Sequence, residues 1–576
     1  MSTLIQVDLQ RSFPRVFVPK NADMGDWAQI EPLFTVLLGR HPASGEELEQ
    51  WLAECSELWG ALGEEKVKRY IAMTSQTDDP IREASYQKFV EDIEPRAKSL
   101  SQALEKAYLE NAFRKRLQSQ RFAVMDRKIE NNVVLFREKN VPLETQDSLL
   151  GQDYHKIMGA MTVSAGAVEL TLDQASKYLE EPDRAVRERV WRQIVARRLQ
   201  DKETLEEIFD RFVALRTEMA ANADFPNYRD YMFRRLERFD YTPEDCFRFH
   251  DGVERAVVPV FRNILLRRQK LLKLDRLRPW DRDVDPFHRP PLRPFTNAGE
   301  LVRGTQEMFT GVHPALGEQF QFMADHGLLE LESRKGKAPG GYQETLFERR
   351  LPFIFMNAVG RDVDVRTLVH EGGHAFHMLA AREEPLFYYR HAPIEFCEVA
   401  SMGMELLATP HLGTFYKTPE DYSRAYRNKL EEVVQLFPAI AMGDAFQHWI
   451  YTHPRHRRAE RSLEWLRLFN RYTPVVDWTG LEAAQSSSWH RILHFFTVPF
   501  YFIEYGIAQI GALQVWLRSR KNYREAVERY WSALALGGSR PLPELFEAAG
   551  ANFRFDYETL LPLMDAIEEE LEKLGD

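Results

Sequence analysis

Long stretches of this chain carry apolar residues at every third or fourth position, which is the spacing of one face of an α-helix. The pattern is clear over residues 45–120, where Glu, Lys and Arg separate apolar positions such as Leu48, Trp51, Leu52 and Cys55. It returns over residues 169–198, where Thr171 or Asp173 can cap one helix and Pro182-Asp183 can begin the next. The pattern predicts a mostly α-helical protein whose first part consists of helical hairpins.

The helical pattern is interrupted twice. Residues 278–294 contain five prolines, so they cannot form a helix interior, and they are either an ordered loop or a linker. Residues 336–357 carry a Pro-Gly-Gly turn followed by two runs rich in β-branched and aromatic residues. We expect one small β-sheet at about residues 340–357, and no other segment has a convincing strand pattern.

The most apolar segment runs from Phe495 to Leu517 and is long enough to cross a membrane. Pro499, Glu504 and Gln509 would be costly in lipid, and no cluster of Lys or Arg immediately precedes the segment. The segment is either a membrane helix or a helix buried in a large protein. Its polar residues favour the buried helix. We expect no membrane partner.

Composition narrows the class of protein. Of the 576 residues, 44% are hydrophobic and 28% are charged, which is typical of a folded, water-soluble protein. A formal net charge of −11 disfavours a nucleic-acid binder, since such proteins use positive fields. The three cysteines lie far apart and the first residues show no secretory signal, so we expect a cytoplasmic protein. Nothing in the sequence indicates an oligomeric state.

The strongest chemical signal is VRTLVHEGGHAFHMLA, residues 365–380. In a helix His370 and His374 lie one turn apart, so both imidazoles can reach one divalent ion. Glu371 is displaced by about 100° toward a water molecule held by that ion. This is the geometry of a zinc hydrolase, and the alternative is a pair of surface histidines on an amphipathic helix.

Two features of this segment argue against surface histidines. Its flanks are almost wholly apolar, so the histidines and Glu371 would be buried polar groups that need partners, and a metal provides them. Gly372 and Gly373 each cost about 1 kcal/mol relative to alanine within a helix. Such a pair is best explained by a substrate or a neighbouring helix that passes close to the backbone.

Catalytic zinc needs a third protein ligand and one open position. Residues 392–408 form a second helical segment that carries Glu395, Glu398 and Glu405. Glu398 comes 24 residues after His374, which suits an antiparallel helix returning past the first, and we expect it to be the ligand. Glu395 would then lie at a solvated helix start, and Glu405 would orient a ligand histidine.

Other histidines and tyrosines are weaker candidates. His377 would compete for the helix face of the two ligand histidines, and His391 is as suitable for a substrate contact as for ligation. A zinc hydrolase also needs donors for the oxyanion that forms when water attacks a carbonyl. His494, Tyr501 and Tyr505 can supply them, although tyrosines in such an apolar run are more often core residues.

Several segments match a known pattern: HEGGHAFH (370–377), EVAS (398–401) with Glu405 beyond it, KAPGGY (337–342), PFIFMN (352–357), HFFTVPFYFIEY (494–505), LEEPDRAVRERVW (179–191) and FRRLERFDYTPEDC (233–246). Together they resemble the thimet oligopeptidase and oligopeptidase F group of zinc peptidases, within it the Pz-peptidase-like bacterial oligoendopeptidases. The sequence departs from that group at Gly372, where the family usually has a large residue. The spacing of His494 to the tyrosines also differs from thimet oligopeptidase proper.

This resemblance implies a mostly helical fold, with two helical halves flanking a deep substrate channel and one small sheet next to the metal-binding helix. The implied regions are an N-terminal helical region at residues 1–165 and a zinc peptidase catalytic region at residues 166–576. The implied metal is one Zn²⁺ per chain, bound by His370, His374 and Glu398. The implied catalytic residues are the general base Glu371 and the oxyanion or substrate-binding residues His494, Tyr501 and Tyr505.

The resulting hypothesis is a zinc-dependent oligopeptidase that hydrolyses peptide bonds in short peptides. We expect an extended peptide to add to PFIFMN as a strand edge, beside a mobile turn. The expected substrate-binding residues are Gly340, Gly341, Tyr342, Phe353, Phe355 and Asn357. The main alternative is a helical zinc carboxypeptidase, which needs a basic residue to hold the substrate carboxylate. A non-enzymatic peptide-binding module and a non-peptide zinc hydrolase are weaker alternatives.

Overall fold

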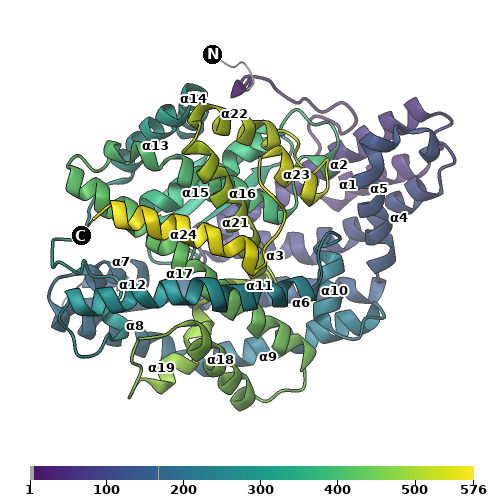
Figure 1. The fold of residues 1–576 in the computed structure, drawn as a ribbon. Helices are drawn as coiled ribbons and strands as arrows, with labels where there is room; N and C mark the ends of the chain where they lie inside the picture. The colour runs from purple at the N-terminus through teal and green to yellow at the C-terminus, as the bar shows by residue number, and fades with distance from the viewer. Residues whose placement is uncertain (1–4, 166–167, 576) are drawn as a thin grey trace.

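The computed structural model describes residues 5–165 and 168–575, and this part of the chain is mostly helical (Figure 1). It also contains two small sheets. The apolar positions predicted on one face between residues 45 and 120 are buried in a core of their own, which confirms the helical pattern. The first helices are α1 (Trp27–Leu38), α2 (Gly45–Ser75), α3 (Pro80–Lys88), α4 (Glu94–Glu110), α5 (Ser119–Leu135) and α6 (Val141–Gly159).

The next helices begin where the sequence predicted. The Thr171 side chain caps one helix and the Asp183 side chain caps the next, whereas Asp173 lies inside the first. These helices are α7 (Leu172–Ser176), α8 (Arg184–Gln200), α9 (Lys202–Asn222), α10 (Tyr228–Arg235), α11 (Pro243–Gly252), α12 (Val258–Leu271), α13 (Ala298–Val312) and α14 (Pro314–Asp325).

The proline-rich residues 278–294 form an ordered loop and not a linker. They contain one short 3₁₀ turn, Pro279–Asp281, and Trp280 is buried. The Asp281 carboxylate is fully buried and is paired with Arg184 and Arg187 of α8, at 2.9 Å and 3.1 Å. A buried carboxylate must be compensated in this way, so these contacts fasten the loop to the helical body.

The predicted sheet is present beside α15 (Asp362–Ala380), the helix that carries His370 and His374. It has three strands in the order β3-β5-β4. β5 (Leu351–Ala358) pairs in parallel with β3 (Leu329–Glu332) and antiparallel with β4 (Tyr342–Leu346). The expectation that PFIFMN is a strand edge was therefore wrong, because β5 has a neighbour on both sides. Within the described residues, β4 is the edge on the side of the turn.

A second sheet was not expected from the sequence. It is a hairpin of β1 (Thr162–Ala165) and β2 (Val168–Thr171), paired antiparallel. Strands of four residues are too short for an alternating pattern to distinguish them from a helix start. The expectation of a single β region was therefore wrong.

Helix α2 holds the β3-β5-β4 sheet from the N-terminal side. The Glu64 carboxylate accepts hydrogen bonds from the backbone N–H groups of Glu348 and Arg349, at 2.9 Å and 2.8 Å, in the turn between β4 and β5. At the other end of β4, the Tyr342 hydroxyl lies 2.6 Å from Thr74 Oγ1, and the Ala338 N–H donates to the Thr74 carbonyl at 2.8 Å. Both ends of the edge strand are thus attached to α2.

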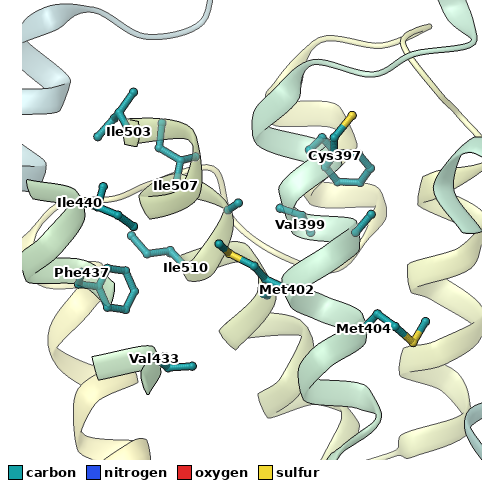
Figure 2. Packing of buried hydrophobic residues seen from close by; sticks show 14 of the residues in the cluster. Cys397, Val399, Met402, Met404, Val433, Phe437, Ile440, Ile503, Ile507 and Ile510 are labelled. Carbon is teal, nitrogen blue, oxygen red and sulfur yellow. The ribbon is translucent and has the colours of Figure 1, made fainter. Parts of the chain in front are cut away.

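The chain after the sheet forms the centre of the molecule. α16 (Ile394–Leu407) packs between α15 (Asp362–Ala380) and α21 (Phe502–Ser519). Val399 and Met402 of α16 lie in an apolar cluster with residues of α17 and α21, such as Phe437 and Ile507 (Figure 2). The remaining helices are α17 (Pro419–Thr452), α18 (Arg458–Tyr472), α19 (Glu482–Ser486), α20 (Leu493–Thr497), α22 (Tyr523–Leu534), α23 (Leu542–Ala548) and α24 (Tyr557–Lys573).

The apolar segment 495–517 is buried within this centre. It is not one helix, because α20 ends at Thr497 and α21 begins at Phe502, with Pro499 between them. No helix among residues 5–165 and 168–575 has the length and apolar character needed to cross a bilayer.

The two glycines of HEGGH are explained by close packing. A Cβ on Gly373 would lie 2.6 Å from the Ala400 carbonyl oxygen and 2.6 Å from Ser401 Cα, so glycine lets α15 and α16 approach each other. A Cβ on Gly372 would lie 2.4 Å from Cζ of Phe309, so glycine leaves room for this ring against α15. The close approach of α16 brings Glu398 to the histidines.

Candidate active site

Three side chains from two helices converge on one point. His370 and His374 of α15 have ring centroids 4.9 Å apart, and their Nε2 atoms lie 3.3 Å and 3.5 Å from Glu398 Oε2 of α16. One donor atom from each residue lies within 4.8 Å of the other two. Donors that share a tetrahedral zinc ion are about 3.3 Å apart, given bonds of about 2.0–2.1 Å. Two imidazoles and a carboxylate in this arrangement fit a divalent ion.

A second layer of contacts fixes the orientation of these side chains. His370 Nδ1 lies 2.8 Å from Glu405 Oε1, and the Lys429 ammonium pairs with the other oxygen of Glu405. His370 therefore presents Nε2 to the converging point, which is the role expected for Glu405. The Ser401 hydroxyl donates to Glu398 Oε2 at 2.9 Å, and the Tyr501 hydroxyl donates to Glu398 Oε1.

Electrostatic interactions favour the charged form of the Glu398 carboxylate. Burial acts to raise the pKa of Glu398, but His374 and His370 outweigh it and hold the pKa well below its usual range. The side chain is only 1% exposed, so it remains a buried anion between two imidazoles. A buried anion of this kind requires cationic compensation, as a bound metal ion would provide.

Glu371 occupies the position of a proton acceptor. Its side chain lines the same cavity as the histidines, and among the described residues its Oε2 has no hydrogen-bond partner. Burial raises the pKa of Glu371, although His370 and His374 oppose the shift. A carboxylate with one free oxygen and a raised pKa can take up a proton and release it again.

Tyr501 and Tyr505 stand at the start of α21, next to His494 of α20. The rings of the two tyrosines are 5.0 Å apart, and Tyr505 OH lies 3.0 Å from His494 Nε2. Burial raises the pKa of both phenols well above the usual value and lowers the pKa of His494 to about 4. All three side chains are therefore neutral at pH 7 and can act as hydrogen-bond donors.

The backbone just before Tyr501 has an unusual conformation that hydrogen bonds hold in place. Phe500 has φ +68°, in the left-handed region that is costly for a residue with a side chain. The Phe500 N–H donates to Gln447 Oε1 at 2.6 Å, and the Phe500 carbonyl accepts a hydrogen bond from the buried Arg238. Arg238 also binds Glu504 at 2.8 Å. These contacts fix the direction in which Tyr501 points.

The cavity that contains these groups lies between the N-terminal helices α2 and α6 and the later helices that carry the converging side chains. Its volume is about 340 Å³. Tyr70 of α2 and His155 of α6 line it from the N-terminal side, and α15, α16, α20 and α21 line it from the other. The β4 edge forms a further wall through residues 341–345. Of the expected substrate-binding residues, the structure thus brings Gly341 and Tyr342 to the cavity.

The other expected substrate-binding residues do not line this cavity. Phe355 is fully buried beneath Tyr342, with ring centroids 4.6 Å apart, and Phe353 is half-buried on the central strand β5. Asn357 supports the turn, because its Nδ2 donates to the carbonyls of Ala338 and Gly340 at 2.9 Å each. Phe353, Phe355 and Asn357 do not lie on a strand edge, because β5 pairs with β3 on one side and with β4 on the other.

Three further candidates, His377, His391 and Glu395, are not among the converging donors. His377 is buried against Phe396, and burial lowers its pKa to about 3. His391 lines the cavity, where burial lowers its pKa to about 4, and it lies 4.0 Å from Cys397 Sγ. Glu395 is not at a solvated helix start as expected: it is 2% exposed, and the Tyr241 hydroxyl donates to it at 2.6 Å.

The sequence did not reveal several cavity residues from the N-terminal part and the sheet. Glu344 follows Tyr342 by two residues, so both side chains lie on the same face of β4. Burial raises the pKa of Glu344 to about 7. The alternation along β4 was a usable signal for Glu344, whereas no local pattern places His155 beside residues more than 200 positions later.

Comparison with known proteins identifies the family of this chain. Residues 177–561 match the model of peptidase family M3, and residues 20–136 match the peptidase M3 N-terminal domain. The first match covers more than half of the chain, so the chain belongs to peptidase family M3.

Individual relatives are distant in sequence. Oligopeptidase PepF of Bacillus subtilis (strain 168) is 22% identical over 370 residues, which cover 61% of this chain and 54% of that protein. The oligoendopeptidase F homolog of Borreliella burgdorferi is 22% identical over 461 residues, which cover 73% of this chain and 73% of that protein. The solved structure of Pz peptidase A with inhibitor 2 superposes with a TM-score of 0.92 at 28% identity, covering 97% of this chain and 100% of that one.

Proposed function

We propose that this member of peptidase family M3 is a zinc-dependent oligoendopeptidase that hydrolyses peptide bonds within short peptides. One observation carries the proposal: His370, His374 and Glu398 converge within a cavity in which Glu371 has a carboxylate oxygen without a hydrogen-bond partner among residues 5–165 and 168–575. The relatives named oligopeptidase and oligoendopeptidase support the same substrate class. We expect this site to bind one zinc ion, and cytoplasmic localisation stays a prediction from the cysteine usage.

The donor set supports zinc as the metal. The two Nε2 atoms and Glu398 Oε2 are borderline and hard donors at the separations that a tetrahedral ion requires. They are three in number, which leaves one position open to a substrate or water. The chemistry that zinc supplies in such a site is Lewis acidity toward a carbonyl and activation of a water molecule.

The chain's own residues then perform the proton transfers and stabilise charge. Glu371 Oε2 accepts the proton of the attacking water and afterwards gives it to the departing amine. The Tyr505 hydroxyl donates a hydrogen bond to the oxyanion that develops on the scissile carbonyl. The Tyr501 hydroxyl, whose single proton is directed at Glu398 Oε1 here, becomes a second donor when it turns from that carboxylate to the oxyanion. His494 holds the Tyr505 hydroxyl in place through their 3.0 Å contact.

The β4 edge is the proposed peptide-binding surface. An extended peptide that pairs with residues 341–345 forms backbone hydrogen bonds without regard to its side chains, and it lies along the cavity wall beside Glu371. The cavity is enclosed by helices of both parts of the chain, so a peptide must enter between them. Folded proteins do not fit such a space, and short peptides do.

The geometry disfavours the carboxypeptidase alternative. Among the described residues that line the cavity, Arg390 is the sole arginine or lysine. Its guanidinium is committed to backbone carbonyls, of Glu384 at 2.9 Å and of Pro385 at 2.7 Å. It therefore has little capacity to hold the carboxylate of a peptide terminus.

A length series of peptides blocked at both ends tests the proposal. Mass spectrometry with and without chelator should show internal cleavage of short peptides that stops when zinc is removed and returns when zinc is added. Folded proteins of ordinary stability should remain intact under the same conditions. Cleavage restricted to peptides with a free carboxyl terminus would establish the carboxypeptidase instead.

A further inference from the structure

A second cluster of metal-binding side chains lies between α11 and α17, which pack against each other. Each helix contributes two polar residues one turn apart: Cys246 and His250 on α11, and Asp444 and His448 on α17. All four are buried, with at most 5% of any of them exposed. None of them lines the active-site cavity.

The donor atoms of this cluster are close together and incompletely satisfied. One donor atom each of Cys246, Asp444 and His448 lies within 4.8 Å of the other two. Asp444 Oδ1 and both ring nitrogens of His448 have no hydrogen-bond partner among the described residues. A buried polar group without a partner destabilises the folded state, so these unsatisfied atoms require an explanation.

The arrangement resembles that of the candidate active site. His448 Nε2 lies 3.3 Å from Asp444 Oδ2, and His370 Nε2 lies 3.3 Å from Glu398 Oε2. His250 Nε2 contacts Asp444 Oδ2 at 2.8 Å. His250 therefore orients the Asp444 carboxylate, in the way that a second layer of contacts orients a metal ligand. Oδ1 is left available.

We propose that Cys246, Asp444 and His448 bind a second divalent metal ion, zinc or a metal of similar chemistry. This ion forms a structural centre that joins α11 to α17. A thiolate, an imidazole and a carboxylate are the side-chain types that zinc uses in proteins. Binding releases the thiol proton of Cys246 to solvent, so that the thiolate sulfur forms the bond to the ion. The ion satisfies Asp444 Oδ1 and one nitrogen of His448 together.

The surroundings give this centre a structural role. The ring of His448 is enclosed by Phe233, Phe247 and Phe500, at centroid distances of 5.9, 5.0 and 5.5 Å. Such an apolar shell keeps solvent and substrate away, unlike a catalytic site. Gln447, the neighbour of His448, holds the Phe500 backbone just before Tyr501. An ion here therefore stabilises the segment that positions the tyrosine.

Metal content tests the inference directly on the full chain. The protein is stripped with chelator, reloaded with zinc, desalted and measured by inductively coupled plasma mass spectrometry. The wild type should retain one equivalent more than the active site alone accounts for. His374→Ala should lose the active-site equivalent and keep the other, and His448→Gln should do the opposite.

Cobalt distinguishes the two sites by their ligands. The three converging residues of the active site, His370, His374 and Glu398, offer no sulfur donor, so we expect a sulfur-to-cobalt charge-transfer band in the near ultraviolet only from a centre that contains Cys246. The band should appear in the wild type and in His374→Ala, and it should vanish in Cys246→Ser and in Asp444→Asn. Cys397→Ser is the matched control: this buried cysteine lies beside Glu398 but outside the second cluster, so the band should persist.

The outcomes separate the second site from the proposed function. A single equivalent of zinc in the wild type, with no cobalt–sulfur band, would overturn the inference while leaving the peptidase proposal intact. If Cys246→Ser fails to fold, the zinc content and cobalt spectrum of the wild type and His374→Ala still decide. A band that persists in Asp444→Asn and His448→Gln but vanishes in Cys397→Ser would place the ion elsewhere and also contradict the inference.

Discussion

The Tyr501 hydroxyl donates its hydrogen bond to Glu398 Oε1, whereas the Tyr505 hydroxyl contacts His494. One tyrosine is thus bound to a proposed metal ligand, and the other points its polar atom at a neutral imidazole. Tyr501 and Tyr505 therefore have different hydrogen-bond partners and different proposed roles, although they lie one helical turn apart. The difference leads to the first prediction.

Tyr505→Phe removes a proposed oxyanion donor whose hydroxyl contacts His494 and not a proposed metal ligand. We expect kcat to fall by about 10²–10³-fold with unchanged zinc affinity. Tyr501→Phe also releases Glu398 from its hydrogen bond, so we expect a fall in kcat together with weaker zinc binding. Steady-state kinetics and zinc titration of both variants check this, and equal zinc affinities for the two variants would contradict the division of roles.

Glu371→Gln removes the proton acceptor while it preserves the shape of the side chain. We expect peptide hydrolysis to fall by about 10³-fold or more, because the amide cannot take up the proton of the attacking water. Zinc content should match the wild type, since Glu371 is not among the converging donor atoms. Substantial turnover by this variant, with normal zinc content, would exclude Glu371 as the base.

Glu405→Gln weakens the contact that orients His370. The neutral amide cannot match the charge-assisted contact to Nδ1 at 2.8 Å, and it leaves Lys429 without its anion. We expect zinc to dissociate about 10–100-fold more readily from the active site. Competition with a chelator measures this, and Glu569→Gln, on the exposed side of α24, is the matched control. Unchanged retention would show that Glu405 only packs there.

Gly373→Ala tests the close approach of α15 and α16. The added Cβ would lie 2.6 Å from backbone atoms of Ala400 and Ser401, so the helices must separate. We expect a loss of about 1–3 kcal/mol in the free energy of unfolding and weaker zinc binding, as Glu398 moves away. Gly413→Ala is the control, because no other atom lies within 4 Å of its added Cβ. Equal denaturation midpoints for the two variants would argue against the packing described.

Glu344 should make stability depend on pH in a defined direction. Its pKa is raised by burial from 4.5 to about 7, so the folded state holds more protons than the unfolded state between these values. The free energy of unfolding contributed by this group is therefore highest below about pH 4.5 and falls as the pH rises to about 7. Beyond that pH the contribution is constant.

Glu344→Gln removes this titration. The variant should gain stability relative to the wild type as the pH rises from about 4.5 to about 7, by at most about 3 kcal/mol. Thermal unfolding of both proteins across this range measures the difference, with Glu569→Gln as the control for loss of an exposed charge. A stability difference that does not change with pH would show that the Glu344 carboxyl is solvated in the folded protein.

The parts of the fold that depend on local periodicity were predictable from the sequence. The helical pattern, the caps at Thr171 and Asp183, and the packing reason for Gly373 all follow from residues a few positions apart. The convergence of Glu398 on the histidines was also predictable, because two adjacent helices joined by a short connection have few ways to pack. Its role as a ligand stays a prediction.

Contacts over long sequence distances were not predictable. The central position of β5 depends on parallel pairing with β3, and no local pattern encodes a parallel partner. Glu395 was expected in solvent because its helix face alone was considered, whereas Tyr241 and Arg238 arrive from a segment 150 residues earlier and bury it. His155 enters the cavity for the same kind of reason.

The attachment of β4 to α2 has a consequence for how a peptide enters. Glu64 holds one end of the edge strand and Thr74 holds the other, and Tyr70 of the same helix lines the cavity. A shift of α2 that widens the entrance therefore carries the edge strand with it. A peptide would therefore enter the cavity and pair with β4 in one concerted motion, because α2 connects the entrance of the cavity to the strand that lies beside the scissile bond.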